Sequence, residues 1–152
     1  MGRTLSYYAG AMYRDFSGFT EARLQELGLH YGSLFFVLYI GKHPGCSPSE
    51  LTKALRVDWG HSQRSVEKLV REGFVIKERP GGGGRAYRLT LTARGQEVFE
   101  ESHRVFFEWD EQKLSALSGE ERQQLLSLLE RAMRRSAPKE AREGAAKKKE
   151  EF

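Results

Sequence analysis

The sequence predicts a mainly helical domain with one small β-hairpin, an α+β class in which helices dominate. Most of the chain carries apolar residues at helical spacing, punctuated by recognisable helix starts and stops. Only two short stretches, FVIKER and RAYRLTLT, have strand patterns, and they flank four consecutive glycines at residues 81–84. The length of 152 residues suits one domain with appendages.

The first forty residues predict two helical segments. Residues 5–27 mix aromatic and polar side chains at roughly helical spacing, although Gly10 and Gly18 argue against one straight helix. Residues 29–40 are strongly apolar and are followed by the stop signal KHPG. This second segment is too long for a typical strand and too short to span a membrane, so we expect a buried helix.

Two closely spaced helices are predicted in the middle of the chain. Ser47 and Glu50 form a capping box at the start of the first. The second has an apolar stripe within residues 66–70 and ends at Gly73, while its opposite face is rich in hydrogen-bonding side chains. Trp59, at its start, is expected to pack against other residues. Two helices this close, the second polar on its outer face, predict a helix-turn-helix.

Two further helices and a tail follow the hairpin. Residues 92–117 have a helical pattern, with Thr92 as the expected N-cap. Ser118 and Glu121 form a second capping box that opens the last helix. From residue 137 on, the chain has almost no apolar side chains, so we expect residues 137–152 to be disordered.

The positive charge is concentrated in the middle third of the chain. Residues 46–94 contain ten Lys and Arg against five Asp and Glu, a net charge of +5. Residues 1–45 have a net charge of +1 and residues 95–152 a net charge of −2. A local basic surface of this kind favours a polyanionic partner, and next to a helix-turn-helix that partner is double-stranded DNA.

The start of the second middle helix carries side chains suited to base edges in the major groove. Arginine pairs well with guanine and glutamine with adenine, so Arg64 is the foremost candidate for a base contact. The full expected set is His61, Ser62, Gln63, Arg64 and Ser65. Phosphate contacts, which add affinity without sequence information, are expected from Ser47, Ser49, Lys53, Arg56 and Lys68. A merely solvated polar face is the alternative.

The glycine-rich tip allows the hairpin to approach DNA closely. Without side chains the tip can follow a narrow minor groove, while arginine adds positive charge there. The expected contacts are Arg79, Gly82, Gly83, Arg85 and Arg88. The alternative is a permissive hairpin tip with no role in DNA binding. A phosphate-binding loop is disfavoured, because the run lacks Gly-Lys-Ser/Thr and leads into a strand.

The ordered set of elements resembles the MarR family of winged-helix transcription regulators over about residues 5–135. Four stretches carry the resemblance: LGLHYGSLFFVL, PGCSPSELTKAL, SVEKLVREGFVIKER and RAYRLTLTARG. The sequence departs from the family at Gly83, where many members have an aspartate that supports the wing arginine, here Arg85.

The resemblance implies both an organisation of the chain and a function. A winged helix-turn-helix at residues 46–94 lies between N-terminal helices at residues 1–45 and C-terminal helices at residues 95–136, which hold a homodimer together, and a charged tail follows at residues 137–152. The implied partner is a pseudo-palindromic DNA operator, with repression as the usual outcome. A winged-helix protein-interaction module without DNA binding is the alternative function.

The resemblance also implies an effector, often a small aromatic anion, bound between the dimerisation and DNA-binding regions. The segments that line this cleft in the family contain Tyr13, Phe16, Tyr31, Phe35, Tyr39 and His43. His43 or Arg14 would pair with an anionic ligand. Ordinary core packing of the aromatic residues is the alternative.

Other function classes are disfavoured. No Ser/His/Asp arrangement, carboxylate pair in a convincing cleft or nucleotide fingerprint points to an enzyme. The four histidines lack ligand spacing, so neither a metal nor another cofactor is predicted. The single cysteine, Cys46, fits a reducing cytoplasm, and redox sensing is the lesser alternative to ordinary packing. We find neither a membrane span nor a secretory signal and expect a cytoplasmic protein.

Overall fold

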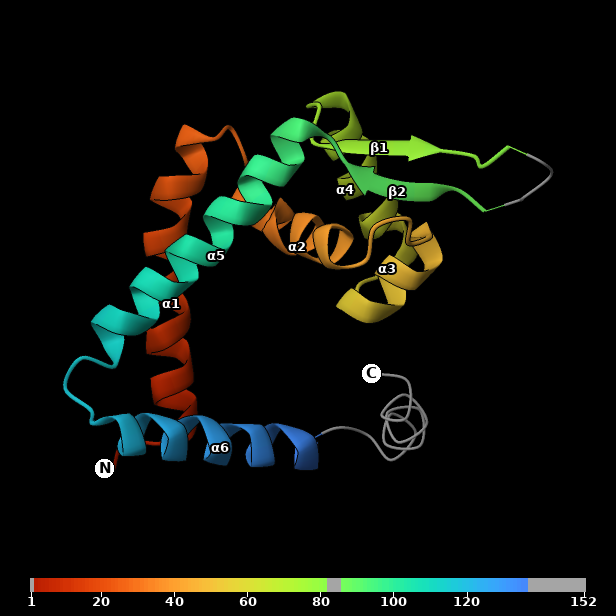
Figure 1. The fold of residues 1–152 in the computed structure, drawn as a ribbon. Coiled ribbons are helices and arrows are strands. Elements are labelled where there is room, and N and C mark those ends of the chain that lie inside the picture. The colour runs from red at the N-terminus through yellow and green to blue at the C-terminus, as the bar shows by residue number, and fades with distance from the viewer. Residues whose placement is uncertain (1, 82–85, 137–152) are drawn as a thin grey trace. The chain divides into compact units, whose positions relative to one another are not determined.

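The computed structural model describes residues 2–81 and 86–136 of the chain. In chain order the elements are α1 (Leu5–Glu26), the short 3₁₀ helix η1 (Tyr31–Ser33), α2 (Leu34–Lys42), α3 (Pro48–Leu55), α4 (Trp59–Arg71), β1 (Val75–Glu78), β2 (Arg88–Leu91), α5 (Ala93–Lys113) and α6 (Gly119–Ser136) (Figure 1). The predicted class, mainly helical with one β-hairpin, is confirmed.

By compactness the chain divides into two units, residues 1–110 and residues 111–152. The predicted boundaries after residues 45 and 94 both fall inside the first unit. The predicted tail at residues 137–152 lies outside the described residues.

Helix α1 is continuous through Gly10 and Gly18, the two residues that argued against one straight helix. Tertiary contacts outweigh the low helix propensity of the two glycines. The ring of Phe16 packs against α5, and both Thr20 and Leu24 are buried on the same side of the helix.

The segment predicted as one buried helix over residues 29–40 is divided in two. The His30 imidazole caps η1 by accepting a hydrogen bond from the N–H of Gly32, and α2 begins only at Leu34. Helix α2 is buried as predicted, with Phe36, Val37 and Ile40 inside the core.

The core lies where α2, α3, α4 and the hairpin meet. Its fully buried side chains include Leu34, Ile40, Leu51, Val66, Leu69, Phe74 and Leu89. The loop before α3 joins the sheet, because the N–H of Leu89 donates to the carbonyl oxygen of Cys46 and the N–H of Gly45 donates to that of Leu89. This pairing fixes the start of α3 relative to the hairpin.

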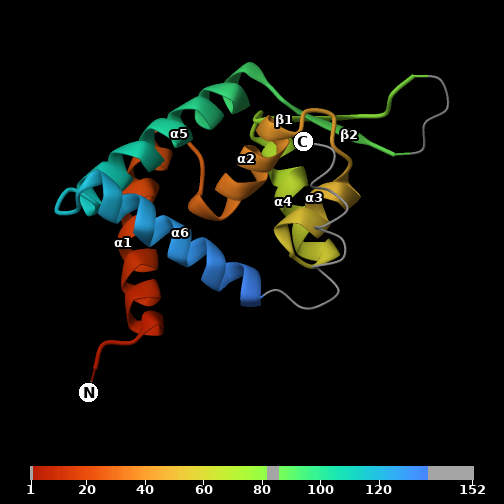
Figure 2. The same cartoon turned by 60° about the horizontal axis from the view of Figure 1, so that its bottom comes forward.

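Strands β1 and β2 form the predicted antiparallel hairpin. Their register runs from Val75 opposite Leu91 to Glu78 opposite Arg88. Val75 and Leu89, on one face of the hairpin, are buried in the core. Beyond β1 the hairpin leaves the body formed by α2, α3 and α4 and projects outward in both views (Figures 1 and 2).

Helix α5 is anchored at its start to the end of α4. The Thr92 hydroxyl accepts from the N–H of Gly95, as predicted for an N-cap, and donates to the carbonyl oxygen of Gly73. Arg94 donates from Nη1 to the carbonyl oxygen of Glu72 at 2.6 Å. Its guanidinium also lies 4.2 Å from the ring centroid of Phe74.

Farther along, α5 packs against α1. An Arg23 guanidinium nitrogen lies 2.6 Å from a carboxylate oxygen of Glu108, and Trp109 donates from Nε1 to Asp15 at 2.7 Å. These contacts join α1 and α5 within the first compact unit.

The second unit is built on α6. Ser118 and Glu121 form the predicted capping box, and Arg122 bridges to Glu111 at 2.7 Å. Several apolar side chains of α6 are nevertheless exposed: Leu126, Leu128, Leu129 and Met133. Among the described residues, we find no helix with the length and apolar character needed to cross a membrane.

Candidate nucleic-acid interface

Local capping interactions set the geometry of α3 and α4. Ser47 and Glu50 form the predicted capping box, and the Asp58 carboxylate caps α4 by accepting from the N–H of His61. Arg56 ends α3 in the left-handed conformation, with φ of 53°. The turn between the two helices is therefore short and well defined, as a helix-turn-helix requires.

A hydrogen bond between two side chains joins α3 to α4 and corrects one prediction. The hydroxyl oxygens of Thr52 and Ser62 lie 2.6 Å apart, and Ser62 is completely buried. A side chain in this position cannot reach a base edge, so we remove Ser62 from the expected base contacts. Its role is to hold the second helix on the first.

The first turns of α4 present an exposed face. His61 and Arg64 are exposed, whereas Gln63 and Ser65 are half-buried. The Arg64 side chain lies back over the first turn of α4. Its Nη1 is so close to Gly60 that a Cβ added there would stand 3.2 Å away. The Nε2 of Gln63 is buried and has no hydrogen-bond partner within the described part of the chain. Four of the five expected base contacts thus remain candidates.

Trp59 also differs from its prediction. It is the first residue of α4 and its side chain is 55 % exposed, so it does not pack as the sequence predicted. Its position beside the exposed turn adds a large aromatic surface that sequence patterns gave no reason to expect.

The expected phosphate contacts differ in their surroundings. Ser49, Lys53 and Arg56 are exposed on and just after α3. The Ser47 hydroxyl already accepts a hydrogen bond from the N–H of Glu50, and the half-buried Lys68 lies 4.0 Å from Glu72. The strongest candidates for phosphate contacts are therefore the three exposed residues.

The hairpin places its two described arginines differently. Arg79 is exposed, and its guanidinium carbon lies 4.7 Å from the ring centroid of Tyr87. Arg88 instead donates to the carbonyl oxygen of Gly45 at 3.1 Å, which ties the hairpin to the loop before α3. The other predicted contacts, Gly82, Gly83 and Arg85, lie outside the described residues.

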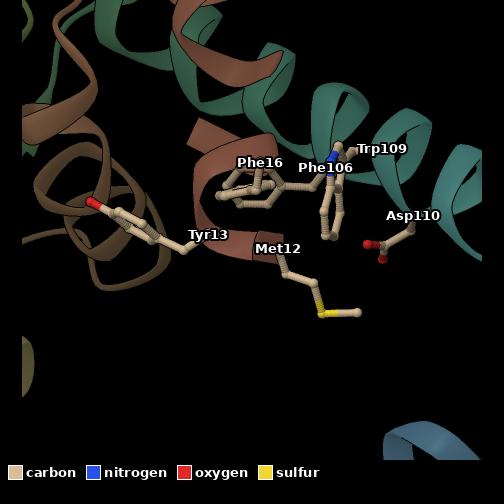
Figure 3. A pocket seen from close by; sticks show the side chains of 6 residues that line it. All are labelled: Met12, Tyr13, Phe16, Phe106, Trp109 and Asp110. Atoms are coloured by element: carbon tan, nitrogen blue, oxygen red, sulfur yellow. The ribbon is translucent and has the colours of Figure 1, made fainter. Parts of the chain in front are cut away.

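A separate pocket of about 370 Å³ opens between α1 and α5. Figure 3 shows the rings of Phe16, Phe106 and Trp109 together, between Tyr13 on one side and Asp110 on the other. The complete lining is Met12, Tyr13, Phe16, Phe106, Trp109 and Asp110.

The structure brings together only part of the predicted effector site. Tyr13 and Phe16 line the pocket, and Tyr31 continues the aromatic cluster with its ring centroid 6.4 Å from that of Phe16. Phe35 extends the cluster, 6.1 Å from Tyr31. The α5 side of the pocket, including Trp109, was not predicted because its residues lie some ninety positions away in the sequence.

Two residues of the predicted effector site lie elsewhere. Tyr39 and His43 stack on each other near the end of α2, with ring centroids 4.4 Å apart. Burial raises the pKa of the Tyr39 hydroxyl. Arg14, two positions from Met12 and Phe16, projects from the opposite face of α1, so neither proposed anion partner lines the pocket.

Cys46 has the environment of a packing residue. Its side chain is buried, and burial raises the pKa of the thiol to about 11. The thiol therefore stays protonated at neutral pH, whereas redox-sensing cysteines have lowered pKa values. Within residues 2–81 and 86–136 we find no group of histidine, cysteine and carboxylate side chains placed to hold a metal ion.

Two helices joined by a short turn, followed by a projecting hairpin and flanked by long helices, define a winged helix-turn-helix protein. A model of the MarR family matches residues 23–86. The chain is also 45 % identical over 131 residues to the HTH-type transcriptional regulator BilQ of Clostridium symbiosum, a match that covers 86 % of this chain and 91 % of that protein. The chain belongs to the MarR family and is a transcriptional regulator.

Two solved structures share the fold of this chain. The HTH-type transcriptional repressor Rv2887 of Mycobacterium tuberculosis is 27 % identical over 84 % of this chain and 89 % of its own length. Its complex with salicylic acid aligns with a TM-score of 0.66 over 86 % of this chain and 97 % of that chain. FabT of Streptococcus pneumoniae, in complex with DNA, is 22 % identical and aligns with a TM-score of 0.76 over 86 % and 93 % of the two chains.

Proposed function

We propose that this regulator binds a pseudo-palindromic operator as a homodimer and represses transcription in the cytoplasm. The observation that carries the proposal is the exposed start of α4, where both His61 and Arg64 are exposed. The ring of His61 also packs edge-on against Phe36, which fixes its place on the helix. Exposed cations flank this turn: Lys53 on α3, Arg56 just after α3, and Arg79 on the hairpin. Such an arrangement supplies base contacts and phosphate contacts from one helix-turn-helix and its wing.

Relatives support the proposal in two respects. FabT, which shares the fold, has been solved in complex with DNA, and Rv2887 is named a transcriptional repressor. Dimerisation is supported by the exposed apolar side chains of α6, because such a surface is costly in water unless a partner covers it.

We also propose that a small aromatic compound binds the pocket between α1 and α5 and releases the operator. The pocket is lined by four aromatic side chains, and related Rv2887 has been solved with salicylic acid. Asp110 is the charged residue of the lining.

The experiment that tests DNA binding is selection of bound duplexes from a random pool, with the wild type and with Arg64→Ala. The wild type is expected to select a roughly palindromic consensus, and Arg64→Ala to change the preferred base at matching positions in both half-sites. A bidentate arginine contact contributes about 1–3 kcal/mol of discrimination, enough to alter a consensus.

The matched control is Arg104→Ala, which removes an exposed arginine from α5 that pairs with Glu101. Its consensus should equal that of the wild type. An unchanged consensus for Arg64→Ala removes Arg64 from the base contacts, and a wild-type protein that enriches no DNA favours the protein-interaction module.

A further inference from the structure

The ring of Tyr87, at the base of the hairpin, contacts two cationic side chains. The Lys77 ammonium lies 4.6 Å and the Arg79 guanidinium 4.7 Å from the ring centroid of Tyr87. Both distances are within the range of a cation–π interaction. The strand register explains why Arg79 lies beside Tyr87. Glu78 pairs with Arg88, so the next residues outward on the two strands are Arg79 and Tyr87.

The two cations differ in what else they contact. The Lys77 ammonium donates to a carboxylate oxygen of Glu67 on α4 at 2.7 Å, and its side chain is only 16 % exposed. This hydrogen bond lowers the pKa of the Glu67 carboxyl, so the carboxylate stays charged and its negative charge faces Lys77. The charge of Lys77 is therefore neutralised inside the molecule.

Arg79 is the cation of this cluster that faces solvent. It is exposed, and within the described ranges it forms no ion pair with a carboxylate. Contact with the face of an aromatic ring leaves the N–H groups in the guanidinium plane free, because a cation–π interaction uses none of them. A guanidinium held in this way can offer two parallel donors to phosphate oxygens.

We propose that Arg79 is a preformed phosphate contact at the base of the wing and that Tyr87 is the residue that positions it. The inference rests on the proposed DNA binding and adds to it a specific division of roles in the hairpin. Arg79 contacts the DNA backbone, whereas Lys77 fixes the ring and the hairpin to α4.

The test measures operator affinity against KCl concentration by fluorescence anisotropy, with a duplex from the selection described above. Each phosphate contact contributes about 0.9 to the slope of log K against log salt. Arg79→Ala is therefore expected to reduce the magnitude of the slope by about 0.9 for each protomer, about 1.8 for a dimer. Arg104→Ala, which removes the same charge on α5, should leave the slope unchanged.

The role of Tyr87 is tested by a double-mutant cycle. Tyr87→Leu is expected to weaken operator binding about two- to fivefold for each protomer, the range of an exposed cation–π interaction. It should have no effect in the Arg79→Ala background, and Tyr87→Phe, which keeps the ring, should bind like the wild type. Any effect transmitted through Lys77 or through folding would persist in the Arg79→Ala background, so the cycle separates positioning from stability.

The possible outcomes distinguish this inference from the function on which it rests. If the wild type binds the operator while Arg79→Ala keeps its slope, the inference is overturned and DNA binding stands. If Tyr87→Leu is equally harmful with and without Arg79, the positioning role is overturned. A wild-type protein that binds no duplex overturns the proposed function itself.

Discussion

Gly95 packs so closely against the backbone of Phe74 that no larger side chain fits at this position. A Cβ on Gly95 would collide with the carbonyl oxygen of Phe74, a backbone atom that cannot rotate away. The close approach allows the start of α5 to lie directly on the segment between α4 and β1. A single residue without a side chain therefore sets the distance between the hairpin and the long helix that follows it.

We expect Gly95→Ala to lower the free energy of unfolding by about 1–3 kcal/mol, the usual cost of overpacking a close contact. The matched control is Gly18→Ala in α1, where an added Cβ has no neighbour within 4 Å. It should raise the free energy of unfolding by about 0.5–1 kcal/mol, because alanine favours a helix over glycine. Urea unfolding at one protein concentration measures both. A stabilised Gly95→Ala would contradict the close contact.

Residues whose interactions are local were predictable from the sequence, and those whose interactions are long-range were not. The capping boxes at Ser47 and Ser118 were predicted correctly, because each partner lies three residues away. The position of Ser62 near the start of its helix predicts a DNA contact, because the sequence does not show which side chain lies opposite it. Its partner, Thr52, lies on another helix, and Arg88 likewise bonds to Gly45 across the sheet.

At the scale of elements, the spacing of apolar residues predicts the helices and strands better than the positions of the glycines do. Helix α1 passes through Gly10 and Gly18 because its packing against α5 compensates for their low propensity. The hairpin was predicted from its alternation alone, and its register then explains the cluster around Tyr87. That cluster was not predicted, because a cation–π contact leaves no sequence signature unless the register of the strands is known.

The exposed apolar side chains of α6 lead to a prediction about the dimer interface. Leu126 and Met133 are seven residues apart and so share one face of α6, with side chains 55 % and 71 % exposed. If this face forms the dimer interface, Leu126→Lys removes about 1.5–3 kcal/mol of apolar burial at each of two symmetric positions. We expect the dimer dissociation constant to rise at least about tenfold, measured by light scattering across a dilution series.

The control for this prediction is Ser127→Lys, because Ser127 is exposed and lies on the side of α6 opposite Leu129. It introduces the same charge and should leave the dimer intact. A mass that is the same for both variants at every concentration would place the interface elsewhere.

At the scale of the compact unit formed by residues 1–110, α5 connects the aromatic pocket to the hairpin. Its first turn is bonded to the end of α4 through Arg94 and Thr92, and its residues Phe106 and Trp109 line the pocket. These two regions lie on one continuous helix, so we expect a change in the spacing of α1 and α5 at the pocket to displace the helix end that carries the hairpin. A rigid element shared by two sites is one route by which they can be coupled.

This coupling predicts how ligand and operator affect each other. Salicylamide and salicylate have nearly the same shape but differ in charge, so together they test whether the pocket binds a neutral or an anionic aromatic compound. Binding is measured by quenching of Trp109 in a Trp59→Phe variant, which leaves Trp109 as the one tryptophan of the sequence. Saturating salicylamide should weaken operator binding by the wild type at least about fivefold, within the usual range of coupling between sites. Because coupling is reciprocal at equilibrium, the operator must weaken salicylamide binding by the same factor.

Quenching without any change in operator affinity would show that the pocket binds aromatic compounds but is not linked to the wing. Tighter binding of salicylate than of salicylamide would show that a cation from elsewhere completes the site.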